Sequence, residues 1–191
     1  MGRSNVWKGC AAGIAGGLAG TVVMTGFQSI WNAAMPREND RSESQQGSES
    51  GSSNGQNRER QDAQQSAEAE NGDPTAKVAD KIVGIAGREL SPEGKKTGGM
   101  VVHYAFGTLM GALYGTALEF APRKYRRNAI GSGLVMATAL FAGADEVALP
   151  ALGLTGSPTE TPPSAHVYGL VSHLVYGATA GVVTRTLRKV M

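Results

Sequence analysis

Two copies of one nine-residue pattern decide the fold of this 191-residue chain: HYAFGTLMG at residues 103–111 and HLVYGATAG at residues 173–181. Both read H-x-x-[FY]-G-x-x-x-G and lie within uncharged, hydrophobic segments. Glycines four residues apart let helix backbones approach closely in a membrane, and a histidine beside them points toward a neighbouring helix rather than toward lipid. The pattern therefore predicts packed membrane helices with polar residues inside the bundle.

The chain has four charge-free runs, two of which contain these patterns. The length of each run is close to the roughly 20 residues that cross about 30 Å of hydrocarbon. The third run reaches that length only by including Asp145 and Glu146. The sequence predicts an all-α membrane protein: a bundle of four transmembrane helices with an extramembrane amphipathic helix and a disordered loop. The expected transmembrane helices are residues 9–35, 98–121, 129–149 and 166–191, the last of which includes a basic cytoplasmic end.

A cleaved signal peptide is the alternative reading of the first hydrophobic segment, because Arg3 and Lys8 give it a basic start. The core of a signal peptide runs about 7 to 15 residues, and the charge-free stretch after Lys8 is longer. We therefore expect an uncleaved helix. The single cysteine, Cys10, excludes an intramolecular disulfide and a cysteine zinc cluster.

Basic residues gather in three short segments, which are the N-terminal residues 1–8, the turn at 122–128 and the end of the fourth helix. Four spans place all three segments on one side of the membrane. Because Lys and Arg in short loops mark the cytoplasmic side, we expect both termini in the cytoplasm and the 150–165 loop outside.

A polar tether at 36–72 and an amphipathic segment at 73–97 separate the first two helices. The tether lacks the apolar residues needed to offset the entropy of ordering, and its acids outnumber its bases, which argues against nucleic-acid binding. Asp73 is expected to cap a helix that begins at Pro74 and continues to Leu90. Its apolar face predicts a place in the membrane interface or on the bundle's outer end, with dimerisation in water as the alternative.

Five ionisable residues form a predicted polar cluster: His103, Asp145, Glu146, His166 and His173. The first four are expected at one depth near the outer ends of three helices, and His173 roughly 10 Å deeper on nearly the same face as His166. Because charges are costly inside a bilayer, such groups need partners or a function. One reading is a site open to the outer side that binds a divalent metal or passes protons. The other is structural, with histidines that bond across glycine contacts, acids that reach water, and His166 merely at the interface.

The predicted packing glycines belong to the second and fourth helices and are Gly107, Gly111, Gly115, Gly169, Gly177 and Gly181. Both helices run from outside to inside in the expected topology, so the shared pattern indicates two duplicated helical hairpins. Four short, glycine-rich spans offer more close-packing surface than one small bundle uses. We therefore also expect a homo-oligomer in the lipid bilayer.

Four segments carry a resemblance to a known family: GIAGGLAGTVVMTGFQ, GRELSPEGKKTGGMVVHYAFGTLMGALYG, ADEVALPALGL and SHLVYG, in that order. In this combination the chain resembles the YagU-like family of bacterial inner-membrane proteins, a domain family without an assigned biochemical function. The likeness covers the first predicted span and about residues 85–185. It implies a multi-pass protein of the bacterial inner (plasma) membrane, and it supplies no catalytic residue.

No nucleophile elbow, phosphate loop, HExxH or paired-cysteine motif is present, so a catalytic role is the less favoured reading and any cofactor stays unknown. Glu119 is expected to form a local ion pair with Arg123 or Lys124. The first hypothesis is an integral inner-membrane protein whose polar cluster supports proton or ion handling or a response to outer pH. The alternatives are a structural or partner-binding membrane protein without transport, and an intramembrane metal hydrolase.

Overall fold

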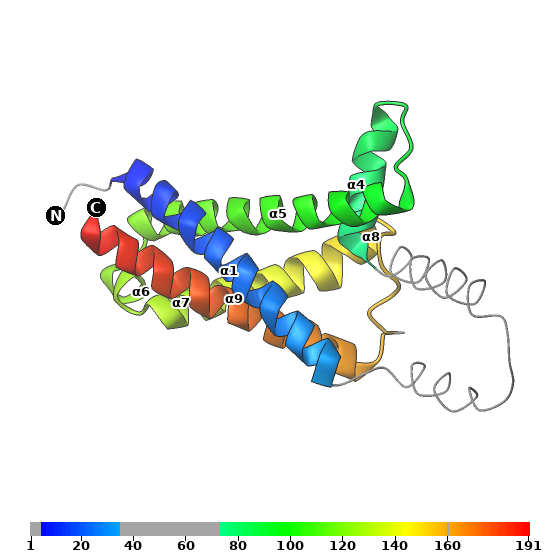
Figure 1. The fold of residues 1–191 in the computed structure, drawn as a ribbon. Coiled ribbons are helices and arrows are strands. Elements are labelled where there is room, and N and C mark those ends of the chain that lie inside the picture. The colour runs from blue at the N-terminus through cyan, green and yellow to red at the C-terminus, as the bar shows by residue number, and fades with distance from the viewer. Residues whose placement is uncertain (1–4, 35–72, 160) are drawn as a thin grey trace, which may run out of the picture.

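The computed structural model describes residues 5–34, 73–159 and 161–191, and the regular structure within these ranges is entirely helical (Figure 1). The predicted all-α class is therefore confirmed, whereas the predicted tether at 36–72 lies outside the described residues. In chain order the helices are α1 (Val6–Ala34), α4 (Pro74–Ile85), α5 (Pro92–Phe120), α6 (Arg123–Arg127), α7 (Ala129–Leu140), the π-helix η1 (Phe141–Ala148), α8 (Leu149–Ala151) and α9 (Pro163–Val190).

Among the residues that the structure describes, three helical stretches are long and apolar enough to cross a membrane, which is consistent with a membrane protein. They are α1, the continuous run of α7, η1 and α8 (Ala129–Ala151), and α9. The fourth predicted span, 98–121, lies in α5 except for its last residue, and α5 has 29 residues but is not one of these three. Glycine, histidine and tyrosine residues lower the average hydropathy of α5. The four-span bundle therefore stays a prediction.

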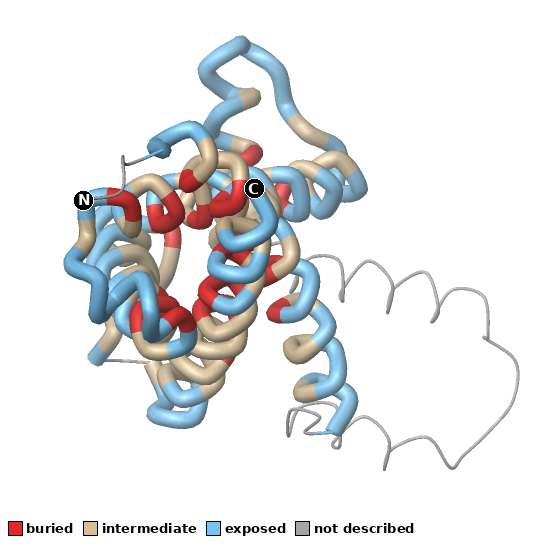
Figure 2. Tube along the Cα trace, turned by 90° about the vertical axis from the view of Figure 1, so that its left-hand side faces the viewer, coloured by how far each residue is buried: buried red, intermediate tan, exposed pale blue. Residues whose placement is uncertain are grey.

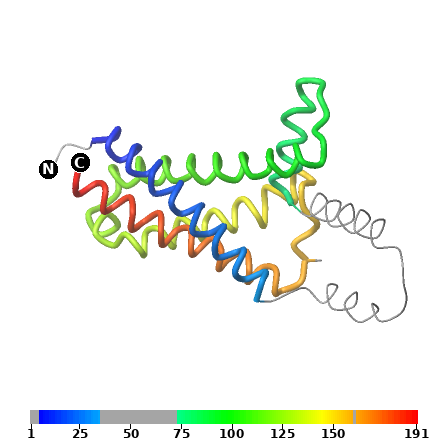
Figure 3. The backbone as a smooth tube through the Cα atoms, in the orientation of Figure 1, coloured from blue at the N-terminus to red at the C-terminus, as the bar shows by residue number. Residues whose placement is uncertain are grey.

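Helix α1 packs along both α5 and α9, and α9 also packs against α7 (Figure 1, Figure 3). The start of α1, the short helix α6 and the end of α9 lie together, and we call this the basic end. The opposite end carries η1, α8 and the start of α9, and we call it the histidine end. Figure 2 shows that the buried residues follow the lines along which the helices meet.

Glycines bring α1 and α5 into backbone contact. The contacts pair three glycines of each helix: Gly9 with Gly115, Gly13 with Gly111 and Gly17 with Gly107. At Gly17, an added Cβ would lie 2.5 Å from the carbonyl oxygen of Gly107 and 2.9 Å from the Cα of Gly111. Real Cβ atoms do not approach backbone so closely, so these positions require glycine as long as the helices keep this spacing.

Helices α7 and α9 repeat this contact in the same register. The facing pairs are Ala129 with Gly181 and Gly133 with Gly177. In each hairpin, two glycines of the H-x-x-[FY]-G-x-x-x-G pattern meet two small residues that are also four apart on the preceding long helix. The shared register favours the predicted duplication of a helical hairpin.

Two buried tyrosines tie α5 to the helices beyond α1. The Tyr114 hydroxyl lies 2.8 Å from Oγ of Ser132 in α7. The Tyr176 hydroxyl of α9 donates to the carbonyl oxygen of Gly107 at 2.6 Å. Because a buried hydroxyl needs a hydrogen-bond partner, each bond satisfies a polar group while it links two helices.

Helix α4 begins as predicted, since the Asp73 side chain accepts from the backbone N–H of Thr75 at 2.8 Å and the first helical residue is the expected proline. The predicted continuation to Leu90 is wrong. The helix ends at Ile85, and Gly87 follows with a left-handed φ of 70°. That conformation, which glycine adopts without strain, stops the helix before its apolar pattern ends.

The apolar face of α4 is divided between the bundle and the surroundings. Ala76 and Ala79 are buried and lie against glycines at the start of α5. Ile82 and Ile85, further along the helix, are 57% and 88% exposed. Figure 1 shows α4 rising steeply from the histidine end, so this exposed apolar part points away from the bundle.

Candidate functional site

The helix that carries the acid pair widens into a π-helix at Phe141–Ala148, and Asp145 and Glu146 lie within this segment. In a π-helix each N–H bonds to the carbonyl five residues back, and such turns are frequent at functional sites. Pro150 gives a physical reason for the change. In an α-helix its ring would press against the carbonyl of Glu146, four residues earlier, and a wider turn relieves that contact.

The π-helix directs both acids toward α9. Oε1 of Glu146 lies 2.7 Å from Nδ1 of His166, and Oδ2 of Asp145 lies 3.6 Å from Nδ1 of His173. The two histidines are seven residues apart on α9, which is about two helical turns, so they share one face of that helix. Two adjacent acids therefore meet two histidines at successive depths.

The two acid–histidine pairs differ in strength and exposure. His166 also has its Nε2 atom 3.0 Å from the carbonyl oxygen of Pro158, and its side chain is 31% exposed. His173 uses Nδ1 to donate to the carbonyl oxygen of Gly169 at 2.9 Å, and its side chain is only 14% exposed. At 3.6 Å the carboxylate of Asp145 is too far for a good hydrogen bond, so this second pair is electrostatic.

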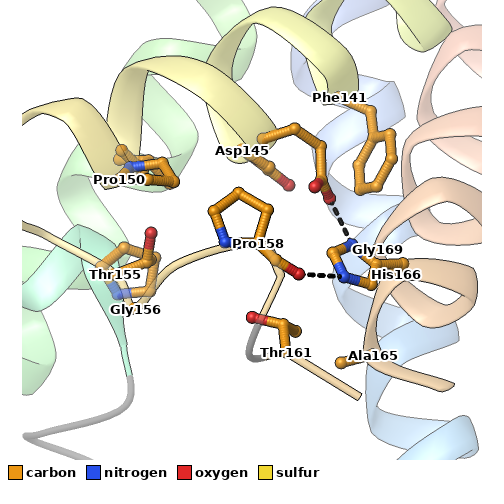
Figure 4. Close-up of a pocket in the computed structure, with 13 residues that line it drawn as sticks. Phe141, Asp145, Pro150, Thr155, Gly156, Pro158, Thr161, Ala165, His166 and Gly169 are labelled. Atoms are coloured by element: carbon orange, nitrogen blue, oxygen red, sulfur yellow. Dashed lines mark hydrogen bonds and ion pairs between the residues drawn. The ribbon is translucent and has the colours of Figure 1, made fainter. Parts of the chain in front are cut away.

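A pocket of about 180 Å³ opens beside the first pair (Figure 4). Its walls come from η1, α8, the connection that follows and the start of α9, and include Phe141, Asp145, Glu146, Pro150, Thr155, Pro158, Thr161, His166 and Gly169. The pocket therefore gives the Glu146–His166 pair a route to solvent.

His103 does not join these hydrogen bonds. It lies on α5, within electrostatic range of Asp73 and His173, and its ring centroid is 5.9 Å from that of Tyr104. Its Nε2 atom is buried and has no hydrogen-bond partner among the described residues. The structure thus brings four of the five predicted cluster residues into pairs. His166, expected only to lie at the interface, makes the shortest contact of the four.

Metal-binding geometry is absent from the part of the chain that the structure describes. No group of three His, Cys, Asp or Glu side chains there is placed to hold a metal ion. A catalytic zinc site uses three protein ligands, whereas this cluster forms separate pairs.

The six predicted packing glycines all lie beside another helix. Gly107, Gly111 and Gly115 face α1, and Gly177 and Gly181 face α7. Gly169 differs, because it makes room for a side chain: an added Cβ would lie 2.9 Å from the ring of Phe141. That ring also lies 5.8 Å from the ring of His173, so Gly169 helps to shape the acid–histidine cluster.

A second ionic contact, at the basic end, was not predicted correctly. Glu119 pairs with Arg188 of α9 rather than with its sequence neighbours Arg123 or Lys124. Its side chain is 3% exposed, and its other oxygen accepts from the backbone N–H of Asn5 at 3.2 Å. The carboxylate therefore joins α5 to α9 and to the start of α1. The absence of a side chain at Gly9 leaves the necessary room.

Comparison with known proteins adds no relative from which a role could be carried over. No protein-family model, curated protein or solved structure matches this chain. The function is therefore inferred from the geometry of the histidine end.

Proposed function

We propose that this chain is an integral membrane protein that binds protons at the outer side of the bilayer and changes a helix contact in response. The observation that carries the proposal is the pair of oxygen acceptors around His166. Nδ1 lies 2.7 Å from a Glu146 oxygen, and Nε2 lies 3.0 Å from the carbonyl oxygen of Pro158.

This geometry fixes the number of protons in the pair. A carbonyl oxygen only accepts, so Nε2 of His166 must carry a hydrogen. The short distance between Nδ1 and the carboxyl group then requires a second hydrogen, either on Nδ1 or on Glu146. The pair therefore holds one proton more than a neutral histidine beside an ionised carboxylate would hold.

Loss of that proton would weaken the contact. The lone pair of a neutral Nδ1 would face a carboxylate oxygen, and the two acceptors would repel each other. Histidine ordinarily titrates between about pH 5 and 8, the range in which an outer-side pH signal falls. Because Glu146 belongs to η1 and His166 to α9, opening the pair loosens these two helices at the pocket.

A four-span bundle is part of this proposal, with α5 as the fourth span. The side chains that α5 exposes include six large apolar ones: Met100, Val101, Phe106, Leu109, Leu113 and Phe120. Gly107, Gly111 and Gly115, by contrast, face α1. Low average hydropathy is expected of a helix whose inward face is built from glycine, histidine and tyrosine.

The orientation and the family are also proposed. The basic end is placed in the cytoplasm, with both termini, because Lys and Arg are enriched in short cytoplasmic loops. Membership in the YagU-like family of bacterial inner-membrane proteins is supported by the segments quoted above. Assembly as a homo-oligomer would be tested by crosslinking in native membranes, where a purely monomeric pattern would contradict it.

Side-chain NMR of the histidines provides the test, because the chain has only three of them. Protein with ¹⁵N-labelled histidine in lipid nanodiscs would be titrated from about pH 5 to pH 8. Each signal would be assigned with single His→Gln variants. We expect His166 to titrate in this range, and we expect Glu146→Gln to change its titration while that of His103 stays the same. The proposal would be refuted if His166 were neutral at every pH, or if its titration were the same in Glu146→Gln as in the wild type.

A structural or partner-binding role is the second candidate, and His173 favours it. Its Nδ1 donates to Gly169 of the same helix, and the carboxylate of Asp145 is more distant. Replacing His173 by Asn keeps a hydrogen-bonding side chain but removes the proton-binding ring. The second candidate would be supported if neither His173→Asn nor Glu146→Gln changed the pH dependence of the His166 NMR signal. The metal hydrolase has no comparable observation in its favour.

A further inference from the structure

Charged side chains are distributed unequally between the two ends of the bundle. The basic end carries eight Lys and Arg residues: Lys8, Arg123, Lys124, Arg126, Arg127, Arg185, Arg188 and Lys189. Glu119 is the one acidic side chain among the described residues of this end, and it is buried against Arg188. The other described acids lie on α4, on the connection to α5, at the start of α5 or on η1.

Arg188 pairs with Glu119 and Lys8 donates to an oxygen of Met191, but the other six cations of the basic end form no ion pair with a described residue. All five residues of α6, with the sequence RKYRR, are exposed, and so are Arg185 and Lys189 at the end of α9. Arg126 and Arg127 form no ion pair with any described residue. Like charges held together in this way repel one another, so negative charge from another molecule would stabilise the arrangement.

Exposed aromatic residues lie among these cations. Trp7 is 65% exposed, Phe120 is 71% exposed and Tyr125 is 43% exposed. Nζ of Lys8 lies 5.8 Å from the Trp7 ring centroid, and Nζ of Lys124 lies 5.0 Å from that of Tyr125. Trp and Tyr concentrate where membrane headgroups meet hydrocarbon, so this mixture matches a lipid surface better than a soluble polyanion.

We propose that the basic end is a binding surface for anionic phospholipid headgroups, formed by α6, the start of α1 and the end of α9. Arginine and lysine clusters directly beside membrane helices are attracted to acidic lipids. The phosphates would lie over α6, while Trp7, Phe120 and Tyr125 contact the glycerol and upper acyl region. This surface is at the opposite end from the acid–histidine cluster, so it does not depend on the proton-binding proposal.

Native mass spectrometry of the detergent-purified full chain would test the surface, with cardiolipin as the anionic probe and phosphatidylcholine as the neutral one. The test variant is Arg126→Gln with Arg127→Gln. The matched control is Arg88→Gln with Lys96→Gln, which removes the same charge from exposed positions near the histidine end. We expect cardiolipin affinity to fall about fivefold for each charge removed from α6, and therefore about 25-fold in the double variant.

Several results would overturn the proposal. They are equal affinity for the two lipids, an equal loss in the control, displacement of cardiolipin by inorganic phosphate at similar concentration, or preferential retention of an oligonucleotide. The single variant Arg127→Gln should lose about fivefold. It provides a second measurement if the double variant fails to fold, and unchanged affinity in a folded single variant would also count against the surface.

Discussion

Replacing Gly17 by Ala tests whether glycine contacts hold α1 and α5 together. The added Cβ would lie 2.5 Å from the carbonyl oxygen of Gly107, 2.9 Å from the Cα of Gly111 and 3.1 Å from the Cα of Thr108. An ordinary carbon–carbon contact is about 3.5 to 4.0 Å. The two backbones must therefore separate by roughly 1 Å, because no flexible side chain at this position can move aside instead.

The expected cost follows from that separation. Overpacking a well-packed interior typically destabilises by about 1 to 3 kcal/mol, and a clash with backbone belongs at the upper end of that range. Separating the helices also loosens the neighbouring contacts of Gly13 with Gly111 and of Gly9 with Gly115. We therefore expect Gly17→Ala to lower the free energy of unfolding by about 2 to 3 kcal/mol.

Gly26 provides the matched control on the same helix. An added Cβ there would have nothing within 4 Å, so Gly26→Ala makes the same chemical change without a clash. Alanine is favoured over glycine in a helix by up to about 1 kcal/mol, so this control should be neutral or slightly stabilising. Unfolding in detergent micelles, followed by helical circular dichroism during titration with a denaturing detergent, would compare the two. Equal stability of Gly17→Ala and Gly26→Ala would refute the close contact.

Three further predictions concern polar contacts. Glu119→Ala leaves the Arg188 guanidinium without its buried partner and should destabilise by about 2 kcal/mol in the same unfolding assay, whereas Glu89→Ala at an exposed position should be neutral. The Glu146–His166 contact needs its shared proton, so it stabilises the fold at low pH and is lost as rising pH removes that proton. Glu146→Gln should therefore reduce the difference in stability between low and high pH, and an unchanged difference in thermal melting would contradict the pairing. Asp73→Ala removes the cap of α4 and should cost about 1 kcal/mol of local stability, seen as faster amide exchange in the first turn of α4.

The local features of the fold were readable from the sequence because their causes lie within a few residues. The glycine spacing in the two repeated patterns predicted which faces of α5 and α9 would be small. Asp73 and Pro74 predicted the start of α4, and the cap is formed as expected. The end of α4 was missed because its apolar pattern continues past Gly87, where the backbone turns.

The contacts that define the ionic sites could not be read in this way. Arg188 is 69 residues away from Glu119, and no spacing rule connects residues so far apart. The π-helix follows from Pro150 only once the helix is known to continue to that residue. The expectation that Glu146 and His166 both lie near the outer ends of their helices did place them near each other. It could not give the acceptor at Pro158, which is what fixes the protonation of the pair.

Helix α1 contacts both α5 and α9, so its contacts can form only after those later helices have been synthesised. Helix α1 precedes α5 and α9 in the chain, and both later helices must find it, α9 through Gly16 and Gly20. In a membrane, the face of α1 that contacts α5 would be exposed to lipid until α5 is synthesised. The face that contacts α9 would stay exposed until α9 follows. A chain interrupted between those helices would leave in the bilayer a half-covered surface to which other glycine-rich helices could bind.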